Sequence, residues 1–291
     1  WYQKSGDLWC IIIPMGWTAE QFGEGLTETQ AWSLFMKKFP LIASHLLPYQ
    51  NAGRKRTDQG DFWWELRACS YYDAFDQPKI IWNDITKLPR FSWDESGLFI
   101  NQKGYIIPSA PPFLLAILQS RVNWFNISQI CTPLRLRAGL WQYQVLAQFV
   151  ERLPIPTTTE SQKDSLGKIA LTITRLANSR YQLHQQMRHR IQSDLGTEHK
   201  SLNTKLVNWW ELDFSDFRTE IKKIFRQDIP LNERDEWEKY LAAQIFKHSE
   251  LTQQIIALEI ELNDIVYKLH DLTPEEIAII EESTKYAYGE V

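Results

Sequence analysis

The sequence predicts an α+β protein, with a mixed α/β part over about residues 1–156 and an all-helical arm over about residues 157–291. Short runs rich in β-branched and aromatic residues, bounded by Pro, Gly and Asn, indicate strands in the first part. Between them, apolar residues at three- and four-residue spacing indicate helices. After Thr157 this helical spacing continues almost without interruption, which is typical of long helices that pack along an apolar seam.

The first 60 residues are expected to form one short strand, two helices and a loop. Residues 8–13 are a β-prone run that stops at Pro14. Apolar positions have helical spacing over 28–39, and a second short helix is expected over 41–47. Residues 51–60 are polar and contain glycine, which is typical of a loop.

The remainder of the mixed part is expected to contain most of the strands. Pro112 is expected to begin a helix that runs through Val122. An extended exit is predicted at 153–156, because its two prolines exclude a helix. The other expected elements are strands over 63–67 and 79–82, a hairpin joining 98–100 to 105–107, a loop over 128–139 and a strand over 142–149.

The helical arm is predicted from two apolar seams. The first covers 166–187 with one polar position, Arg180, and the second covers 237–269. At 1.5 Å per residue the second helix would be about 50 Å long, which is too long for an ordinary core helix. Two such seams are most simply packed against each other as an antiparallel, coiled-coil-like arm. From the residues alone, a helical bundle of unspecified use is an equal alternative.

Charge and cysteine content restrict the classes of function. The net charge is −4, but residues 1–156 carry 15 Lys+Arg against 13 Asp+Glu, hence +2, and the remainder carries 17 against 23, hence −6. This balance argues against a general nucleic-acid coat and still permits a local basic face in the first part. The three cysteines (Cys10, Cys69 and Cys131) have no paired spacing, so we expect buried thiols in a reducing, cytoplasmic compartment.

Two further features concern targeting. No apolar run is long enough to span a membrane, so no membrane partner is expected. The chain begins at Trp1 without a methionine, and we therefore expect it to be a piece of a longer protein.

Three motifs follow one another in a characteristic order: Trp63-Trp64-Glu65-Leu66-Arg67, then Pro78-Lys79-Ile80-Ile81, and finally Pro154-Ile155-Pro156. Over roughly residues 30–156 this order resembles the C-terminal specificity, or target-recognition, domain of the TaqI-like and Eco57I-like (type IIG) adenine-specific DNA methyltransferases of restriction-modification systems. A weaker likeness covers 266–277, where His270 stands at a position that usually holds tyrosine in that family.

The resemblance implies a role in choosing a DNA sequence, with double-stranded DNA as partner. It also implies that S-adenosylmethionine is bound by a methyltransferase catalytic domain, in cis or in trans, while the arm positions that domain or forms a dimer. Two alternatives stay open: a stand-alone specificity subunit, and a helical protein-interaction scaffold with no role on DNA.

The sequence predicts no catalytic and no cofactor-binding residue. Gly23 and Gly25 form a glycine pair without a preceding strand or a third glycine, so we interpret them as a loop. An Asn/Asp-Pro-Pro-Tyr/Phe corner would hold a flipped adenine, but Ala110 replaces the Asn or Asp before Pro111 and Pro112.

No metal site is predicted either. Asp58 or Asp61 followed by Glu65 faintly resembles a magnesium nuclease site, but Arg67 stands where a lysine is needed. A structural Glu65–Arg67 pair at a sheet edge explains this pattern better.

Candidate DNA-binding residues are cations and one amide in the expected loops. A run such as Arg54-Lys55-Arg56 is usually a solvated surface, but its position before the Trp63–Arg67 motif favours phosphate contacts. The arginines could also read guanine with their paired N–H groups, and the amide could read adenine. The predicted residues are Arg54, Lys55, Arg56, Asn83, Lys87, Arg90, Arg135 and Arg137.

Overall fold

The computed structural model describes residue 1 and residues 8–196 and 200–290. The chain divides into two compact units. Unit 1 comprises 1–3, 78–95 and 100–291, and unit 2 comprises 4–77 and 96–99. The predicted α+β class is confirmed, since helices predominate beside two small antiparallel sheets. The units divide the chain differently from the boundary expected at 156, because 100–156 and the arm belong to one unit.

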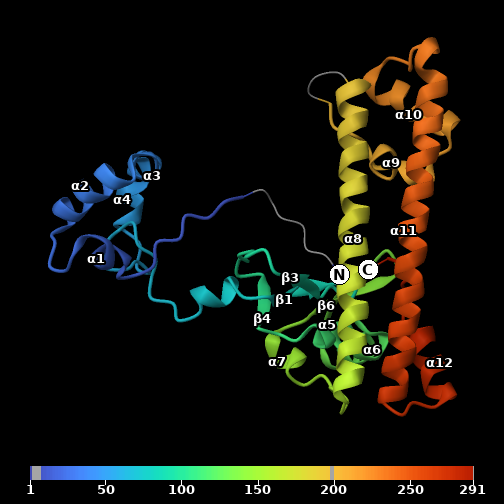
Figure 1. The fold of residues 1–291 in the computed structure, drawn as a ribbon, viewed down its shortest axis with the longest axis horizontal. Helices are drawn as coiled ribbons and strands as arrows, with labels where there is room; N and C mark the ends of the chain where they lie inside the picture. Colours follow the sequence, from blue (N-terminus) through green and yellow to red (C-terminus); the bar gives the residue numbers. More distant parts are fainter. Residues whose placement is uncertain (2–7, 197–199, 291) are drawn as a thin grey trace. The chain divides into compact units, whose positions relative to one another are not determined.

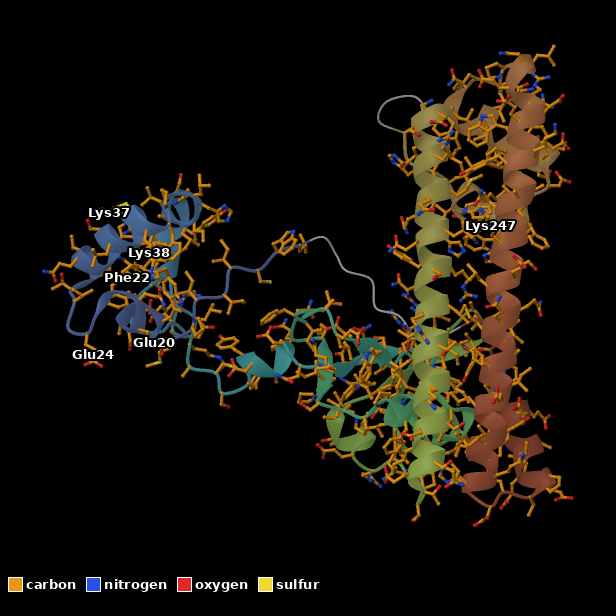
Figure 2. The ribbon with its side chains drawn as sticks, in the orientation of Figure 1. Glu20, Phe22, Glu24, Lys37, Lys38 and Lys247 are labelled. Carbon is orange, nitrogen blue, oxygen red and sulfur yellow. The ribbon has the colours of Figure 1, made fainter. Side chains whose placement is uncertain are left out.

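Unit 2 is a small helical unit (Figure 1). Its core consists mainly of aromatic side chains. A capping box begins its longest helix, because Thr27 accepts from the backbone of Gln30 and Gln30 accepts in return. Lys38, at the end of that helix, donates to Gln21 at 2.8 Å and lies over the ring of Phe22 (Figure 2). The elements are α1 Trp17–Phe22, α2 Glu28–Lys38, α3 Pro40–Leu46, η1 Leu47–Tyr49, α4 Gln50–Gly53 and η2 Tyr72–Phe75.

Two of the expected strands are absent from unit 2. Residues 8–13 form no strand, and the side chains of Leu8 and Trp9 are 87% and 96% exposed. Residues 63–67 form a turn with a single bridge between Gln59 and Leu66. The strand predictions were wrong because the β-prone residues found no partner strand, and a strand is stable only when its backbone groups are paired.

The first sheet of unit 1 has the order β3-β1-β4 and is antiparallel. Strand β1 (Lys79–Asn83) confirms the expected strand at 79–82, and β3 is Ser92–Asp94. The expected hairpin was wrong: 98–100 forms no strand, and β4 (Gly104–Pro108) pairs with β1 instead. The ammonium of Lys79 is fully buried and lies 2.5 Å from a carboxylate oxygen of Asp94, so the two inner charges compensate each other.

The second sheet has the order β2-β6-β5, from β2 (Ile85–Thr86), β6 (Leu140–Gln144) and β5 (Thr132–Arg137). The loop expected over 128–139 was wrong for half of its length, since 132–137 form β5. The final strand is shorter than expected, since 147–150 form helix α7 (Ala147–Val150). The hairpin turn was not predicted because its usual signal, Asn or Asp before Gly, is missing. Ala138 (φ 51°) stands before Gly139 (φ 77°) instead.

Two helices replace the single helix expected from Pro112. Helix α5 (Pro112–Gln119) ends at Ser120, whose hydroxyl accepts from the backbone of Asn123 and begins α6 (Arg121–Ile130). The exit at 153–156 is extended, as the prolines predicted. These helices pack on the first sheet and on the near end of the arm in one apolar core.

The arm consists of α8 (Glu160–Asp194) and α11 (Arg234–Leu269), which lie side by side as an antiparallel pair (Figure 1). The pairing of the two predicted seams is confirmed: Ile173 and Leu262 are buried in the core shared with the first sheet. Leu183 and Leu241 lie in a second core at the far end of the arm. The remaining elements are α9 Thr204–Val207, η3 Trp209–Glu211, α10 Phe214–Phe225, η4 Leu231–Glu233 and α12 Pro274–Ser283.

A pair of histidines lies at the second core of the arm, against Trp209 and Trp210. His184 Nε2 lies 2.9 Å from His248 Nδ1, and the indole of Trp210 stacks on both rings. Burial lowers the pKa of His184 to about 3 and that of His248 to about 4, so both rings are neutral near pH 7. None of the helices that the structure describes is long and apolar enough to cross a membrane.

Candidate nucleic-acid interface

The hairpin of β5 and β6, hereafter the ribbon, is a largely exposed element of unit 1. Every residue of β5 is exposed. Register places Arg135 opposite Gln142 and Arg137 opposite Leu140, so the two arginines lie on one face of the ribbon. Arg135 Nε donates to Gln142 Oε1 at 2.5 Å, which holds one guanidinium over the ribbon. Leu136 and Trp141 face each other on the opposite side.

The two ribbon arginines are not neutralised. No acidic side chain pairs with Arg135 or Arg137 among the residues that the structure describes. By contrast, Lys79 and Arg121 of the same unit pair with Asp94 and Glu281. The ribbon therefore offers two guanidinium groups without an acidic partner in the described part of the chain. Each keeps several N–H donors for an anionic or polar ligand, although Arg135 Nε donates within the ribbon.

The structure brings Lys87 to the same sheet, although it is far from the ribbon in sequence. Lys87 directly follows β2, which pairs with β6 on the edge opposite β5. Asn83 ends β1 just before β2, and its side chain is exposed. Arg90 is also exposed, in the segment that leads into β3. Five of the eight predicted residues thus lie in unit 1, and three of these lie on or directly beside the second sheet.

The other three predicted residues lie in unit 2, and two of them have structural partners. Arg54 pairs with Glu28 at the surface. Arg56 Nη2 donates to the carbonyl oxygens of Trp63 and Glu65, at 3.0 and 2.7 Å. Only the exposed side chain of Lys55 has no such partner in the described part of the unit. Tertiary contacts thus engage the first and the third cation of the run predicted to bind phosphates.

The Glu65 carboxylate has a structural task in unit 2. It is fully buried and accepts from the backbone N–H groups of Gly16, Thr18 and Asp61, at 3.3, 2.9 and 3.0 Å. The expected pairing of Glu65 with Arg67 was wrong, because backbone donors occupy the carboxylate. Within the described residues no group of three or more His, Cys, Asp or Glu side chains could hold a metal ion.

A cavity of about 240 Å³ lies beside the ribbon in unit 1. Sequence reasoning identified Lys87 but missed Trp141 and Lys285, which also line it. The alternation of β6 could have indicated Trp141. No local signal could have indicated Lys285, because it reaches the cavity from the segment after α12, far along the chain.

Comparison with protein families matches residues 159–266 to a domain of unknown function, DUF8810. The matched segment contains nearly all of α8 and α11 and the elements between them. It covers less than half of the chain and does not include the ribbon. Among curated proteins, none matches the chain. The arm is therefore similar to a domain family whose function is unassigned.

Proposed function

We propose that the chain is the DNA target-recognition module of an adenine-specific DNA methyltransferase of a restriction-modification system. The observation that carries the proposal is the ribbon, which presents Arg135 and Arg137 without acidic partners among the described residues. A two-stranded ribbon fits the major groove of B-DNA, and an arginine fork matches the N7 and O6 acceptors of guanine. The ribbon would therefore read base edges.

Other cations would bind the DNA backbone. Lys87 and Arg90 are suited to phosphate contacts, which give affinity without sequence information. Asn83 is an exposed amide that could read an adenine edge. In unit 2, Lys55 and the surface residue Arg54 would add phosphate contacts, whereas Arg56 would serve the fold.

The arm would hold the catalytic partner. A groove of about 520 Å³ between α8 and α11 is lined mainly by polar side chains, among them Lys247 (Figure 2). Its amides, which include Gln182, Gln186 and Gln254, can both donate and accept hydrogen bonds. In this proposal the arm contacts a methyltransferase catalytic domain, in cis or in trans, or a second arm in a dimer. That domain would bind S-adenosylmethionine and methylate adenine N6 in the cytoplasm.

The experiment compares DNA binding by the chain and by the double variant Arg135→Ala/Arg137→Ala. A preferred duplex is first selected from a random library at low salt. Fluorescence anisotropy then gives affinities for that duplex and for random DNA. We expect the variant to lose about 1–3 kcal/mol of binding to the selected duplex for each base contact removed, and less on random DNA.

A variant of equal charge change provides the control. Arg175→Ala/Lys239→Ala removes two exposed cations from the arm and should bind both duplexes like the unchanged chain. Equal losses in the two double variants would make the ribbon effect one of net charge only. Failure of the unchanged chain to bind any duplex at low salt would overturn the proposal and favour a protein-interaction scaffold.

The assignment of catalysis to another domain has a test of its own. The chain alone should transfer no methyl group from labelled S-adenosylmethionine to duplex DNA, whereas addition of the catalytic domain should restore transfer. Transfer by the chain alone would contradict this part of the proposal.

A further inference from the structure

We propose that the cavity beside the ribbon binds a single unpaired nucleotide, with the base on aromatic side chains and the phosphate on two lysines. The cavity of about 240 Å³ lies between β6, α6 and the segment after α12, all within unit 1. It is smaller than the usual range of about 300–1,000 Å³ for sites of drug-sized ligands. One base with its phosphate suits this size better than a larger cofactor.

Aromatic side chains supply the walls. Trp124 is 6% exposed and stands edge-on to Tyr143, with ring centroids 5.7 Å apart, so this pair is held in place by the core. Phe125 adds a third ring. Trp141 differs from them, because its side chain is 48% exposed at the cavity. An indole with a free face beside a cavity is suited to stack on a flat base.

Two lysines define the charge of the ligand. Lys87 follows β2 and Lys285 follows α12, yet both line the same cavity. No acidic residue is among the described residues that line it. The hydroxyls of Ser128 and Ser283 also line it, but each already donates to a helix carbonyl, so the lysines are the donors for an anion. Rings alone would suit a neutral aromatic compound and lysines alone a simple anion, whereas their combination points to a nucleotide.

The position of the cavity connects it with the proposed function. Trp141 lies on β6 and the ribbon arginines lie on the paired strand β5. Strand register places Trp141 on the face opposite Arg135 and Arg137. A nucleotide that has left the base stack of DNA bound to the arginine face would have to pass the edge of the ribbon to enter the cavity, and it would lose its stacking in the duplex. This source of the nucleotide rests on the proposed function, while binding of a free nucleotide does not.

The first experiment measures nucleotide binding to the whole chain by calorimetry. Deoxyadenosine monophosphate and deoxycytidine monophosphate should bind at millimolar concentration or below, and deoxyadenosine and inorganic phosphate should each bind at least tenfold more weakly. Trp141→Ala should weaken nucleotide binding by about 5- to 150-fold. Trp141→Phe should retain most of the binding, which separates stacking from a folding defect.

The lysines are tested by the double variant Lys87→Ala/Lys285→Ala. It should bind deoxyadenosine monophosphate and deoxyadenosine with similar affinity, because only the phosphate contact is lost. Trp9→Ala provides a matched control, since Trp9 is an exposed tryptophan of unit 2 and its loss should leave nucleotide binding unchanged. No heat of binding with either nucleotide, or an unchanged affinity in Trp141→Ala, would overturn the proposal.

A second experiment separates the two sources of nucleotide. A duplex with one unpaired nucleotide should compete with the monophosphate, and a fully paired duplex of the same sequence should compete more weakly, if DNA supplies the ligand. Equal competition would reject the DNA source. The variant Arg135→Ala/Arg137→Ala should still bind the free monophosphate. Failure of the proposed function would thus remove duplex binding alone, and failure of this inference would remove monophosphate binding alone.

Discussion

The chain contains two arginine pairs of similar sequence pattern, Arg54 with Arg56 in unit 2 and Arg135 with Arg137 in unit 1, and the fold treats them differently. Arg54 pairs with Glu28, and Arg56 donates to two carbonyl oxygens of the turn at 63–67. The ribbon pair has no acidic partner in the described part of the chain. Two arginines separated by one residue therefore predict a role only when the groups around each guanidinium are known.

The difference has a simple physical origin. The turn carbonyl of Trp63 has no backbone donor among the described residues, and Arg56 supplies one from the loop that precedes the turn. Arg56 also donates to the Glu65 carbonyl, which accepts from a backbone N–H as well. In a ribbon, backbone groups already pair across the strands, so they do not need side-chain donors, and Arg135 donates to another side chain instead. The irregular turn at 63–67 thus takes hydrogen bonds from a nearby cation. The paired strands of the ribbon need no such donor, so its cations can contact a ligand.

The largest expected effect concerns the turn that engages Arg56. Glu65→Ala would remove a buried carboxylate that accepts from three backbone N–H groups. We expect a loss of about 3–5 kcal/mol in the stability of unit 2, since each stranded donor costs about 1–3 kcal/mol. Hydrogen exchange of peptides from 10–75 measures this loss. Glu28→Ala, at the surface, should change it by less than about 0.5 kcal/mol.

The second prediction compares one arginine from each pair. Arg56→Ala should destabilise unit 2 by about 1.5–3 kcal/mol, because charged hydrogen bonds to carbonyls are lost. Arg137→Ala should change the stability of unit 1 by less than about 0.5 kcal/mol, because its side chain is exposed. Urea titrations followed by hydrogen exchange report on each unit separately. Equal effects in the two variants would remove the distinction between the pairs.

The third prediction separates the shape of a ribbon arginine from its charge. Arg137→Lys keeps the positive charge but removes the planar fork that matches guanine. Binding to the selected duplex should weaken by about 1–2 kcal/mol, and binding to random DNA should hardly change. Anisotropy titrations at one fixed salt concentration measure both. If Arg137→Lys bound the selected duplex with the affinity of the unchanged chain, Arg137 would contact phosphate only.

The smallest effect is expected at Lys55, the one cation of 54–56 whose side chain has no partner in the described part of unit 2. Lys55→Ala should weaken binding to the selected duplex and to random DNA equally, by less than about 1 kcal/mol. The slope of log affinity against log salt should become shallower by about 0.9, which corresponds to one phosphate contact. An unchanged slope would mean that Lys55 makes no phosphate contact.

The sequence alone determined the elements that depend on local periodicity. The seams of α8 and α11 could be predicted because the residues on one face of a helix recur every three or four positions. Ile173 and Leu262 are buried, as that spacing requires. The buried run 79–82 was likewise legible as β1. The prolines at 154 and 156 excluded a helix because of their own covalent geometry.

Only the tertiary structure decided the ribbon, the turn at 63–67 and the residues that meet at the cavity. Whether a β-prone segment becomes a strand depends on a partner elsewhere in the chain: 8–13 finds none, whereas 132–137 pairs with β6. Lys87 and Lys285 reach one cavity through packing that no local pattern encodes. Periodicity is a property of neighbouring residues, but pairing, burial and charge compensation depend on residues that are distant in sequence.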